Sequence, residues 1–179
     1  MKIRLLVLAA LLIFMRLSFA EADDGMSKYR LGVGDTISII VFDEKELSVD
    51  RVKLSDAGTI SYPMLGEIKV LGLTVSELQN SVMEKLKGKY LINPKVTVVI
   101  NQYRDVFVNG QVHKPSSFPY QHGLTVGKAI TIAGGFKDRA YKEAVSIIHE
   151  NQENPTPVKS PLSTLVEPGD IITVEESFF

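Results

Sequence analysis

The sequence of 179 residues contains no cysteine, and this absence excludes several kinds of structure at once. Disulfide bonds cannot form, so a buried apolar core must hold the fold, and roughly 155 residues can build such a core without cross-links. No thiolate is available as a metal ligand. No cysteine near the N-terminus can carry a lipid, so we expect a protein that is not a lipoprotein.

Long apolar runs are also missing after residue 25, where the apolar stretches are only as long as β-strands. A membrane-spanning helix needs roughly 20 apolar residues. We therefore expect the mature chain not to cross a membrane by itself. The terminal Ser177-Phe178-Phe179 is expected to end a strand whose aromatic rings cover a core or contact another subunit.

The first twenty residues have the three-part pattern of a secretory signal peptide. Lys2 and Arg4 precede the apolar run Leu5–Met15, and Ser18 and Ala20 place small residues at the −3 and −1 positions of a cleavage site. An uncleaved membrane anchor is the alternative, and it would bring Arg16 close to the bilayer interior at a high cost. The pattern predicts a signal peptide over residues 1–20 and export to the periplasm, with cleavage after Ala20 or after Ala22.

Basic and acidic residues are nearly balanced once this segment is removed. Cleavage leaves 17 of the 20 basic residues against all 21 acidic ones, a net charge near −4. Nucleic-acid binding needs a basic stripe, so the sequence argues against a nucleic-acid partner.

Apolar residues alternate in many short segments and follow a helical period in only two. The first predicted helix covers 75–87 and opens with Thr74 and Glu77 in the spacing of a capping box, and the second covers 126–133. Loops are expected over 110–121 and 151–161. Strands are predicted at 36–42, 49–54, 59–62, 67–71, 96–101, 105–109, 144–149 and 170–174.

Two short motifs occur twice in the chain. Gly72–Val75 repeats as Gly123–Val126, and each copy opens a predicted helix. Gly34-Asp35 and Gly169-Asp170 each open a predicted strand. The repetition predicts an α+β fold made of two small modules with similar local turns, and two copies are too few for a solenoid.

Several segments, in order along the chain, resemble known families. Five segments resemble the polysaccharide export domain of Wza-type outer-membrane polysaccharide exporters: Tyr29–Ile37, Asp56–Ile60, Pro63–Gly66, Gly72–Val75 and Asn93–Val96. Later positions resemble the soluble-ligand-binding β-grasp (SLBB) domain that follows it in these proteins: Val108–Val112, Pro115, Ala133–Gly135 and Pro168–Ile172. The resemblance implies a strand-rich polysaccharide export domain over 26–101, followed by a β-grasp domain over 102–179.

This resemblance implies a periplasmic component of an exopolysaccharide or capsule export machine, which forms or adapts a conduit for the polymer towards the outer membrane. Its implied partners are the polysaccharide, further copies in a homo-oligomeric ring, and an inner-membrane polysaccharide co-polymerase. The chain departs from the longer exporters because it lacks further β-grasp repeats, a C-terminal helix and a lipidation cysteine. Ser116 also replaces the glycine that usually follows the β-grasp proline. We therefore expect a separate outer-membrane channel protein, and association with the outer membrane through partners. The alternative is a monomeric periplasmic glycan-binding module.

Residue patterns of known chemistry are weak in this chain. Gly32 and Gly34 lead into a strand, whereas a phosphate-binding loop leads into a helix. Asp43, Glu44 and Glu46 are typical of a solvated loop more than of a glycosidase pair. His113, His122 and His149 lack metal-ligand spacing, and no G-x-S-x-G motif is present. We expect no cofactor, no metal and no enzymatic activity.

Aromatic and basic side chains remain as candidates for binding. Rings can stack on sugars, and cations attract acidic polymers. The alternative is that these residues form a solvated surface and pack between subunits. The candidates for glycan or subunit contact are Tyr103, Arg104, Tyr120, Lys137, Arg139, Tyr141 and Lys142.

Overall fold

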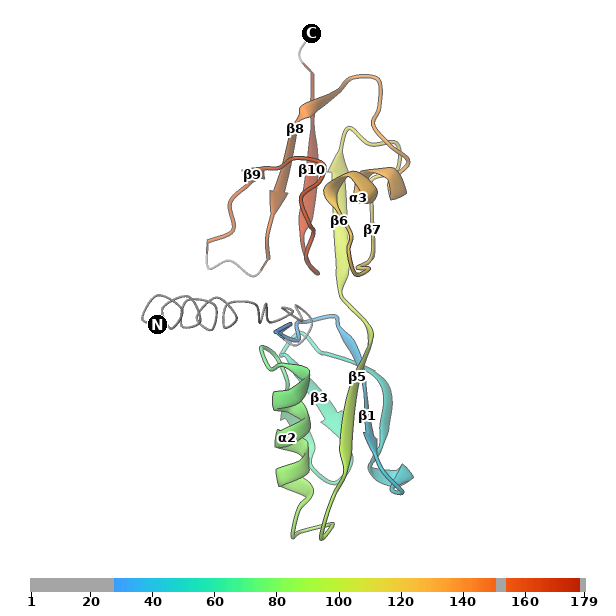
Figure 1. Ribbon diagram of the computed structural model, residues 1–179, viewed down its shortest axis with the longest axis vertical. Coiled ribbons are helices and arrows are strands. Elements are labelled where there is room, and N and C mark those ends of the chain that lie inside the picture. The colour runs from blue at the N-terminus through green and yellow to red at the C-terminus, as the bar shows by residue number, and fades with distance from the viewer. Residues whose placement is uncertain (1–27, 151–153, 178–179) are drawn as a thin grey trace, which may run out of the picture.

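The computed structural model describes residues 28–150 and 154–177, which form two modules stacked end to end (Figure 1). The chain passes from one to the other once, where the last strand of the first module leads through Tyr103 and Arg104 into the first strand of the second. The predicted signal peptide, the segment 21–27 and the terminal Phe178 and Phe179 lie outside the described residues.

The first module is a three-stranded antiparallel sheet covered by one helix, with a separate hairpin. The sheet has the order β2-β1-β5, and the hairpin pairs β3 with β4. The elements are β1 (Thr36–Val41), the 3-10 turn η1 (Lys45–Leu47), β2 (Val49–Lys53), β3 (Thr59–Tyr62), β4 (Gly66–Lys69), α2 (Val75–Leu86) and β5 (Val96–Gln102). Leu78, Val82 and Leu86 form the buried stripe of α2, because spacings of three and four place them on one side of the helix.

The second module is a five-stranded mixed sheet with one short helix. Its order is β7-β6-β10-β8-β9, in which β10 pairs parallel with β6 and antiparallel with β8. This parallel pair beside a single helix is the β-grasp arrangement. The elements are β6 (Asp105–Gly110), β7 (Ser116–Pro119), α3 (Val126–Ile132), β8 (Ala140–Ile148), β9 (Val158–Lys159) and β10 (Ile171–Glu176).

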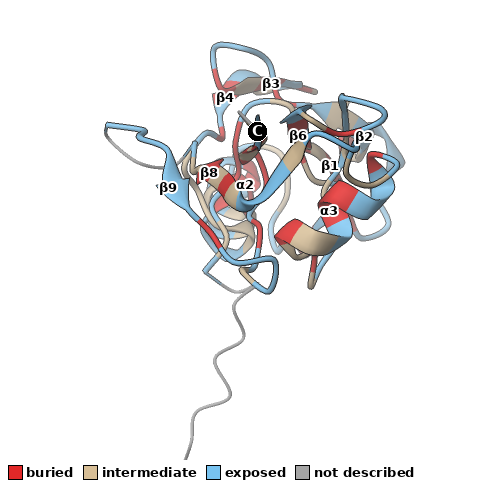
Figure 2. Cartoon of the chain, turned by 90° about the horizontal axis from the view of Figure 1, so that it is seen from above, coloured by how far each residue is buried: buried red, intermediate tan, exposed pale blue. Residues whose placement is uncertain are grey.

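Each module has its own apolar core. One core runs from Leu31 to Val98 and the other from Val106 to Val174, and no residue belongs to both. Figure 2 shows buried residues gathered on the strands and on one side of the helices, with exposed residues around them. The predicted α+β class with two small modules is confirmed, whereas the boundaries 26–101 and 102–179 stay a prediction. No helix among the described residues is long and apolar enough to cross a membrane.

Most predicted elements form within a few residues of their expected bounds, and two short strands form where the sequence predicts loops. The predicted loop 110–121 contains β7, and the predicted loop 151–161 contains β9. Both are edge strands, where proline is tolerated because one side of the strand needs no ladder bonds. Strand β8 begins at Ala140, four residues earlier than predicted, because Ala140 pairs with Glu176 at the end of β10 and packs against the core.

Candidate functional site

The two repeated Gly-Asp motifs form the same turn in both modules, and the two turns meet at the module junction. The backbone N–H of Gly32 donates to Asp35 Oδ2 at 2.7 Å, and that of Glu167 donates to Asp170 Oδ2 at 2.7 Å. Each Asp is buried and follows a glycine with φ of 92°. Only glycine adopts this backbone conformation at low cost, so the sequence repeat reflects a repeated structure.

The second repeated motif caps a helix in both modules. Thr74 accepts from the backbone N–H of Glu77 and Thr125 accepts from that of Lys128. Only the first cap is reciprocal, because Glu77 also accepts from the Thr74 N–H at 2.8 Å. This backbone hydrogen bond is the main cause that lowers the pKa of the Glu77 carboxyl.

The cap and the turn are joined in the same way in each module. Leu31, four residues before Asp35, donates its N–H to the carbonyl of Leu73. Val166, four residues before Asp170, donates its N–H to the carbonyl of Leu124. The junction is therefore built from two equivalent units, each made of one aspartate turn and one helix cap.

Arg104, a predicted contact residue, lies between the two modules and binds side chains of both. Its backbone N–H donates to Asp35 Oδ1 at 2.7 Å, and its guanidinium donates from Nη1 to Tyr29 Oη at 2.7 Å. Its Nε donates to Glu150 Oε2 at 2.7 Å from the second module. The Arg104 side chain is only 7% exposed and that of Asp35 is fully buried. An Arg–carboxylate pair out of water is stable only when such bonds satisfy it, so the network fixes one module against the other.

Glycines at this place leave room for the guanidinium. A Cβ on Gly32 would overlap the Arg104 guanidinium, and a Cβ on Gly169 would overlap Glu150 and approach Arg104 Nε to 2.7 Å. The glycines that the sequence suggested as turn residues therefore also provide the space for the inter-module contact.

Three tyrosines form a chain of edge-to-face rings beside Arg104. The ring centroids of Tyr29 and Tyr103 are 5.0 Å apart, and those of Tyr103 and Tyr120 are 5.5 Å apart. Burial raises the pKa of all three phenols, and the hydrogen bond from Tyr29 to Asp35 raises that of Tyr29 further. The three phenols stay neutral at ordinary pH, and their ring contacts connect the two modules.

A cleft of about 730 Å³ opens beside these rings, between the modules. Half of its lining comes from each module, and each half includes the first residue of one aspartate turn, Gly32 or Glu167. The lining is formed by residues 28–32, 71–72, 120, 122–123 and 165–168. Leu165 is the most open apolar side chain here, at 66% exposure.

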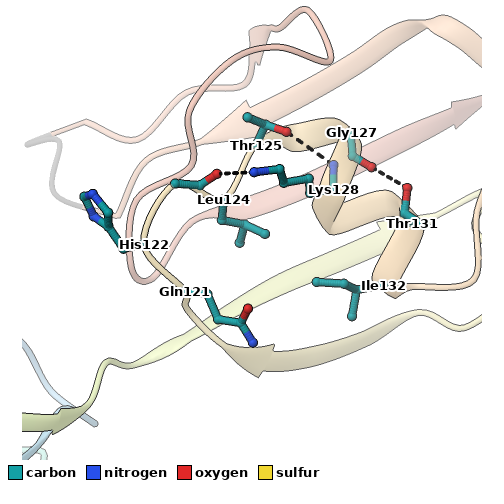
Figure 3. A pocket seen from close by; sticks show the side chains of 9 residues that line it. Gln121, His122, Leu124, Thr125, Gly127, Lys128, Thr131 and Ile132 are labelled. Atoms are coloured by element: carbon teal, nitrogen blue, oxygen red, sulfur yellow. Dashed lines mark hydrogen bonds between the residues drawn. The ribbon is translucent and has the colours of Figure 1, made fainter.

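A second hollow of about 530 Å³ adjoins the cleft, because His122 and Gly123 line both. Figure 3 shows His122 at one end of it and Ile132 at the other, with α3 along one side. Lys128 Nζ donates to the carbonyl of Gly123 at 2.9 Å. In the cleft, Arg30 Nη1 donates to the carbonyl of Gly72 at 2.7 Å. The carbonyls of the two equivalent glycines, Gly72 and Gly123, thus each accept a hydrogen bond from a basic side chain.

The seven predicted contact residues separate into two groups. Tyr103, Arg104 and Tyr120 come together at the junction, although the Arg104 side chain is enclosed there. The remaining four lie near the opposite end of β10, because Arg139 forms an exposed ion pair with Glu176 at 3.3 Å. That group consists of Lys137, Arg139, Tyr141 and Lys142, all exposed. A contact of either group with glycan or a second subunit stays a prediction.

Sequence reasoning identified Arg104 but not its main partners, Asp35, Tyr29 and Glu150. The repeated Gly-Asp motif marked Asp35 as structural, yet no spacing rule joins it to Arg104, 69 positions later. Asp170 is a further buried acid, and His149 Nδ1 lies 3.0 Å from its Oδ1. Burial is the main cause that raises the pKa of Asp170. No group of three or more His, Asp or Glu side chains suited to a metal ion occurs within the described ranges.

Comparison with known proteins gives the same two-part division. The family described as polysaccharide biosynthesis/export protein matches residues 23–101, and the SLBB domain matches residues 106–164. The exopolysaccharide production protein ExoF of Rhizobium meliloti is 31% identical over 144 residues, which cover 74% of this chain and 33% of ExoF.

A second group of relatives comes from Ralstonia. The EPS I polysaccharide export outer membrane protein EpsA of Ralstonia solanacearum is 27% identical over 187 aligned positions, covering 82% of this chain and 48% of EpsA. EpsA of Ralstonia nicotianae is 30% identical over 132 residues, covering 60% of this chain and 34% of EpsA. The chain therefore spans between a third and a half of the length of these relatives.

Proposed function

The chain belongs to the polysaccharide biosynthesis/export family with an SLBB domain, and on this basis we propose that it works in polysaccharide export in the cell envelope. It acts there as a periplasmic component that forms or adapts a conduit for an exopolysaccharide or capsule polymer on its way to the outer membrane. The names of its relatives support the export role, since they describe exopolysaccharide production and polysaccharide export.

The observation that carries this proposal is the fixed junction between the two family domains. Arg104 and Asp35 connect the modules through bonds that are largely out of water. A conduit needs subunits of defined shape, and this hydrogen-bonded network holds the two modules of each copy in the same relative orientation. The function follows from assembly, and no bond-making chemistry is assigned to the chain.

Copies of the chain are proposed to assemble into a ring around the polymer. A ring uses one heterologous contact repeatedly, so each subunit needs two different surfaces that fit each other. The exposed group around Tyr141 at the far end of β10 is one candidate surface. An inner-membrane co-polymerase on one side and a separate outer-membrane channel on the other would complete the path.

The alternative proposal is a monomeric periplasmic glycan-binding module. The cleft favours it, because a concave site with aromatic walls and a few polar groups is the usual form of a small-ligand site. Both proposals use polysaccharide as the ligand, but they differ in oligomeric state.

Mass photometry and negative-stain electron microscopy of the purified mature chain separate the two. We expect closed assemblies of several copies, alone or after addition of the co-polymerase's periplasmic domain. A chain that stays monomeric at every concentration, with and without that domain, would overturn the conduit proposal in favour of the monomeric one. Arg139→Glu with Tyr141→Ala should weaken the assembly, whereas Ile92→Glu at a 93% exposed position of the first module serves as the control.

A further inference from the structure

Three connections meet at the end of the first module that lies away from the junction: the β1–β2 connection, the β3–β4 turn and the α2–β5 loop (Figure 1). Each carries one strongly exposed apolar side chain, Phe42 at 64%, Met64 at 65% and Ile92 at 93%. We call this end, formed by Phe42, Met64 and residues 87–95, the tip. We infer that the tip docks on the surface of an anionic phospholipid bilayer, with Ile92 and Met64 inserted among the headgroups. The inference goes beyond the proposed export function and does not depend on it.

The α2–β5 loop is ordered by its own hydrogen bonds, although Ile92 on it is exposed. The backbone N–H groups of Tyr90 and Leu91 both donate to the Leu86 carbonyl, at 3.1 and 3.0 Å. The N–H of Gly88 donates to the Leu91 carbonyl at 2.8 Å, and the Leu91 side chain packs against the core of the first module. A loop that is fixed before binding loses little conformational entropy on binding.

Hydrogen bonds join the other two connections to this loop. Tyr90 Oη donates to the Met64 carbonyl at 2.8 Å. The backbone N–H of Phe42 donates to the Lys95 carbonyl at 3.0 Å, and Lys95 Nζ lies 5.6 Å from the centroid of the Phe42 ring. The three apolar side chains therefore belong to one surface. An exposed group of apolar side chains marks a site of contact with a protein or a membrane.

Basic side chains flank Ile92, and its loop contains no acidic residue. Lys87, Lys89 and Lys95 are all exposed, and none of them forms an ion pair with another described residue. Their long apolar stems allow the ammonium groups to reach lipid phosphates while Ile92 lies deeper. Tyr90 adds an aromatic ring of the kind that is enriched where headgroups meet acyl chains.

Acidic residues occur on only one of the three connections. The β1–β2 connection contains Asp43, Glu44 and Glu46, with Lys45 between them. In the last turn of α2, Glu84 and Lys85 add one charge of each sign. An anionic surface therefore attracts the α2–β5 loop and repels the β1–β2 connection. The docked molecule tilts accordingly, with Ile92 closer to the acyl chains than Phe42.

A bilayer suits the tip better than a folded protein does. A stable protein interface buries about 800 Å² on each partner between closely matched shapes. The tip instead presents three apolar side chains that project from three separate connections. A fluid lipid surface accommodates such projections without matching their shape, and apolar side chains beside lysines are typical of proteins that lie on a membrane surface.

Vesicle flotation of the chain without residues 1–20 measures the binding. The predicted signal peptide is left out because its apolar run over 5–15 would itself bind lipid, and both cores remain complete. The vesicles contain phosphatidylcholine alone, or phosphatidylcholine with one quarter phosphatidylglycerol. We expect the chain to bind the anionic vesicles and to bind the neutral ones less.

Matched variants test the location. Ile92→Glu should weaken binding to the anionic vesicles at least about tenfold, because a buried isoleucine is lost and a like charge is added. Leu165→Glu makes a similar change at a 66% exposed position of the second module and should leave binding unchanged. Lys89→Gln should weaken binding about fivefold on anionic vesicles only. Circular dichroism verifies that the variants are folded.

The depth of insertion can be measured with a single fluorophore, because the chain contains no tryptophan. On anionic vesicles, the emission of Ile92→Trp should move to shorter wavelength and be quenched by brominated acyl chains. Leu165→Trp should show neither effect.

Several results would overturn the inference. They are absence of binding to both kinds of vesicle, equal binding to both, equal losses for Ile92→Glu and Leu165→Glu, or equal quenching of the two tryptophans. If Ile92→Glu instead abolishes binding to the co-polymerase's periplasmic domain and leaves vesicle binding unchanged, the tip is a protein-docking surface and the inference is wrong. Assembly is measured without lipid, so the proposed function and this inference can fail separately.

Discussion

Arg104 joins the two modules directly, although arginine is usually a surface residue. Its position after β5 places it between two aspartate turns, and Gly32 and Gly169 leave room for its side chain. An exposed charge pair contributes little to the free energy of folding. Loss of one partner of a buried pair costs several kcal/mol, because the other charge stays buried without it. The environment of a residue therefore decides what the same guanidinium does.

The first prediction compares two arginines that each form an ion pair. Arg104→Met should lower the free energy of unfolding by about 3 kcal/mol, because the buried Asp35 and the Tyr29 hydroxyl lose a partner. Arg139→Met removes an exposed pair with Glu176 and should cost less than about 1 kcal/mol. Urea unfolding followed by circular dichroism measures both. Equal losses for the two variants would show that the junction is not a buried network.

The second prediction concerns alkaline pH. Burial raises the pKa of Tyr62 from 10.0 to about 12, and burial also raises the pKa of Tyr29. The folded state therefore retains protons that the unfolded state releases above pH 10, and the stability from these phenols is present below that pH and lost above it. Stability should fall as the pH rises from 10 towards 12.

Ultraviolet absorbance of phenolate, recorded with circular dichroism during an alkaline titration, follows this loss. Tyr62→Phe should reduce the pH dependence, since it removes one of these phenols. Full ionisation of all tyrosines near pH 10, before any unfolding, would contradict the burial seen at both positions.

At the scale of the elements, the parallel pairing of β6 with β10 brings Gly110 closer to a neighbouring backbone than any other glycine that the structure describes. Gly110 pairs with Val174, has φ of 82°, and a Cβ there would overlap the Val174 carbonyl oxygen. Gly88 has φ of 77°, but nothing lies within 4 Å of its Cβ position. The two glycines share a conformation and differ in available space.

This difference gives a matched test. Gly88→Ala should cost about 1 kcal/mol, because a side chain is strained at positive φ. Gly110→Ala should cost about 2 kcal/mol more, because strand β10 must also move away from β6. Thermal unfolding measures both values. A loss at Gly110 no larger than that at Gly88 would mean that the strands separate without cost.

The sequence predicts an element best where residues close together in the chain make the interactions that begin or end it. Helix α2 begins at the predicted residue because Thr74 and Glu77 cap it reciprocally, and it ends one residue early. Strand β7 lies in a segment for which the sequence predicts a loop. Its two serines and Pro119 favour turns, and its pairing with β6 overrides that preference. Tertiary pairing carries no local signal of this kind.

The candidate site shows the same limit. Tyr103, Arg104 and Tyr120 were identified from residue type, and they do lie together. Their convergence with Tyr29, Asp35 and Glu150 depends on how two modules pack, which no short spacing encodes. The repeated motifs indicate two similar units, but not that both contribute residues to one cleft between the modules.

The whole molecule combines two separate cores with one polar junction, and the cleft lies between the two modules beside that junction. An apolar junction would hold the modules together equally well, but the polar network specifies one relative orientation through directed bonds. The proposed assembly into a ring needs such a fixed orientation, because every copy must present the same pair of contact surfaces. The shape of one copy is then the same in every position.

The most direct test of the central claim is where the polymer accumulates in cells that lack the gene. Polysaccharide in the medium and in the envelope fraction is quantified in the deletion strain, and again after expression of the full chain. We expect polymer to be trapped in the envelope on deletion and its release to be restored by the full chain. Unchanged release in the deletion strain would contradict a role in polysaccharide export.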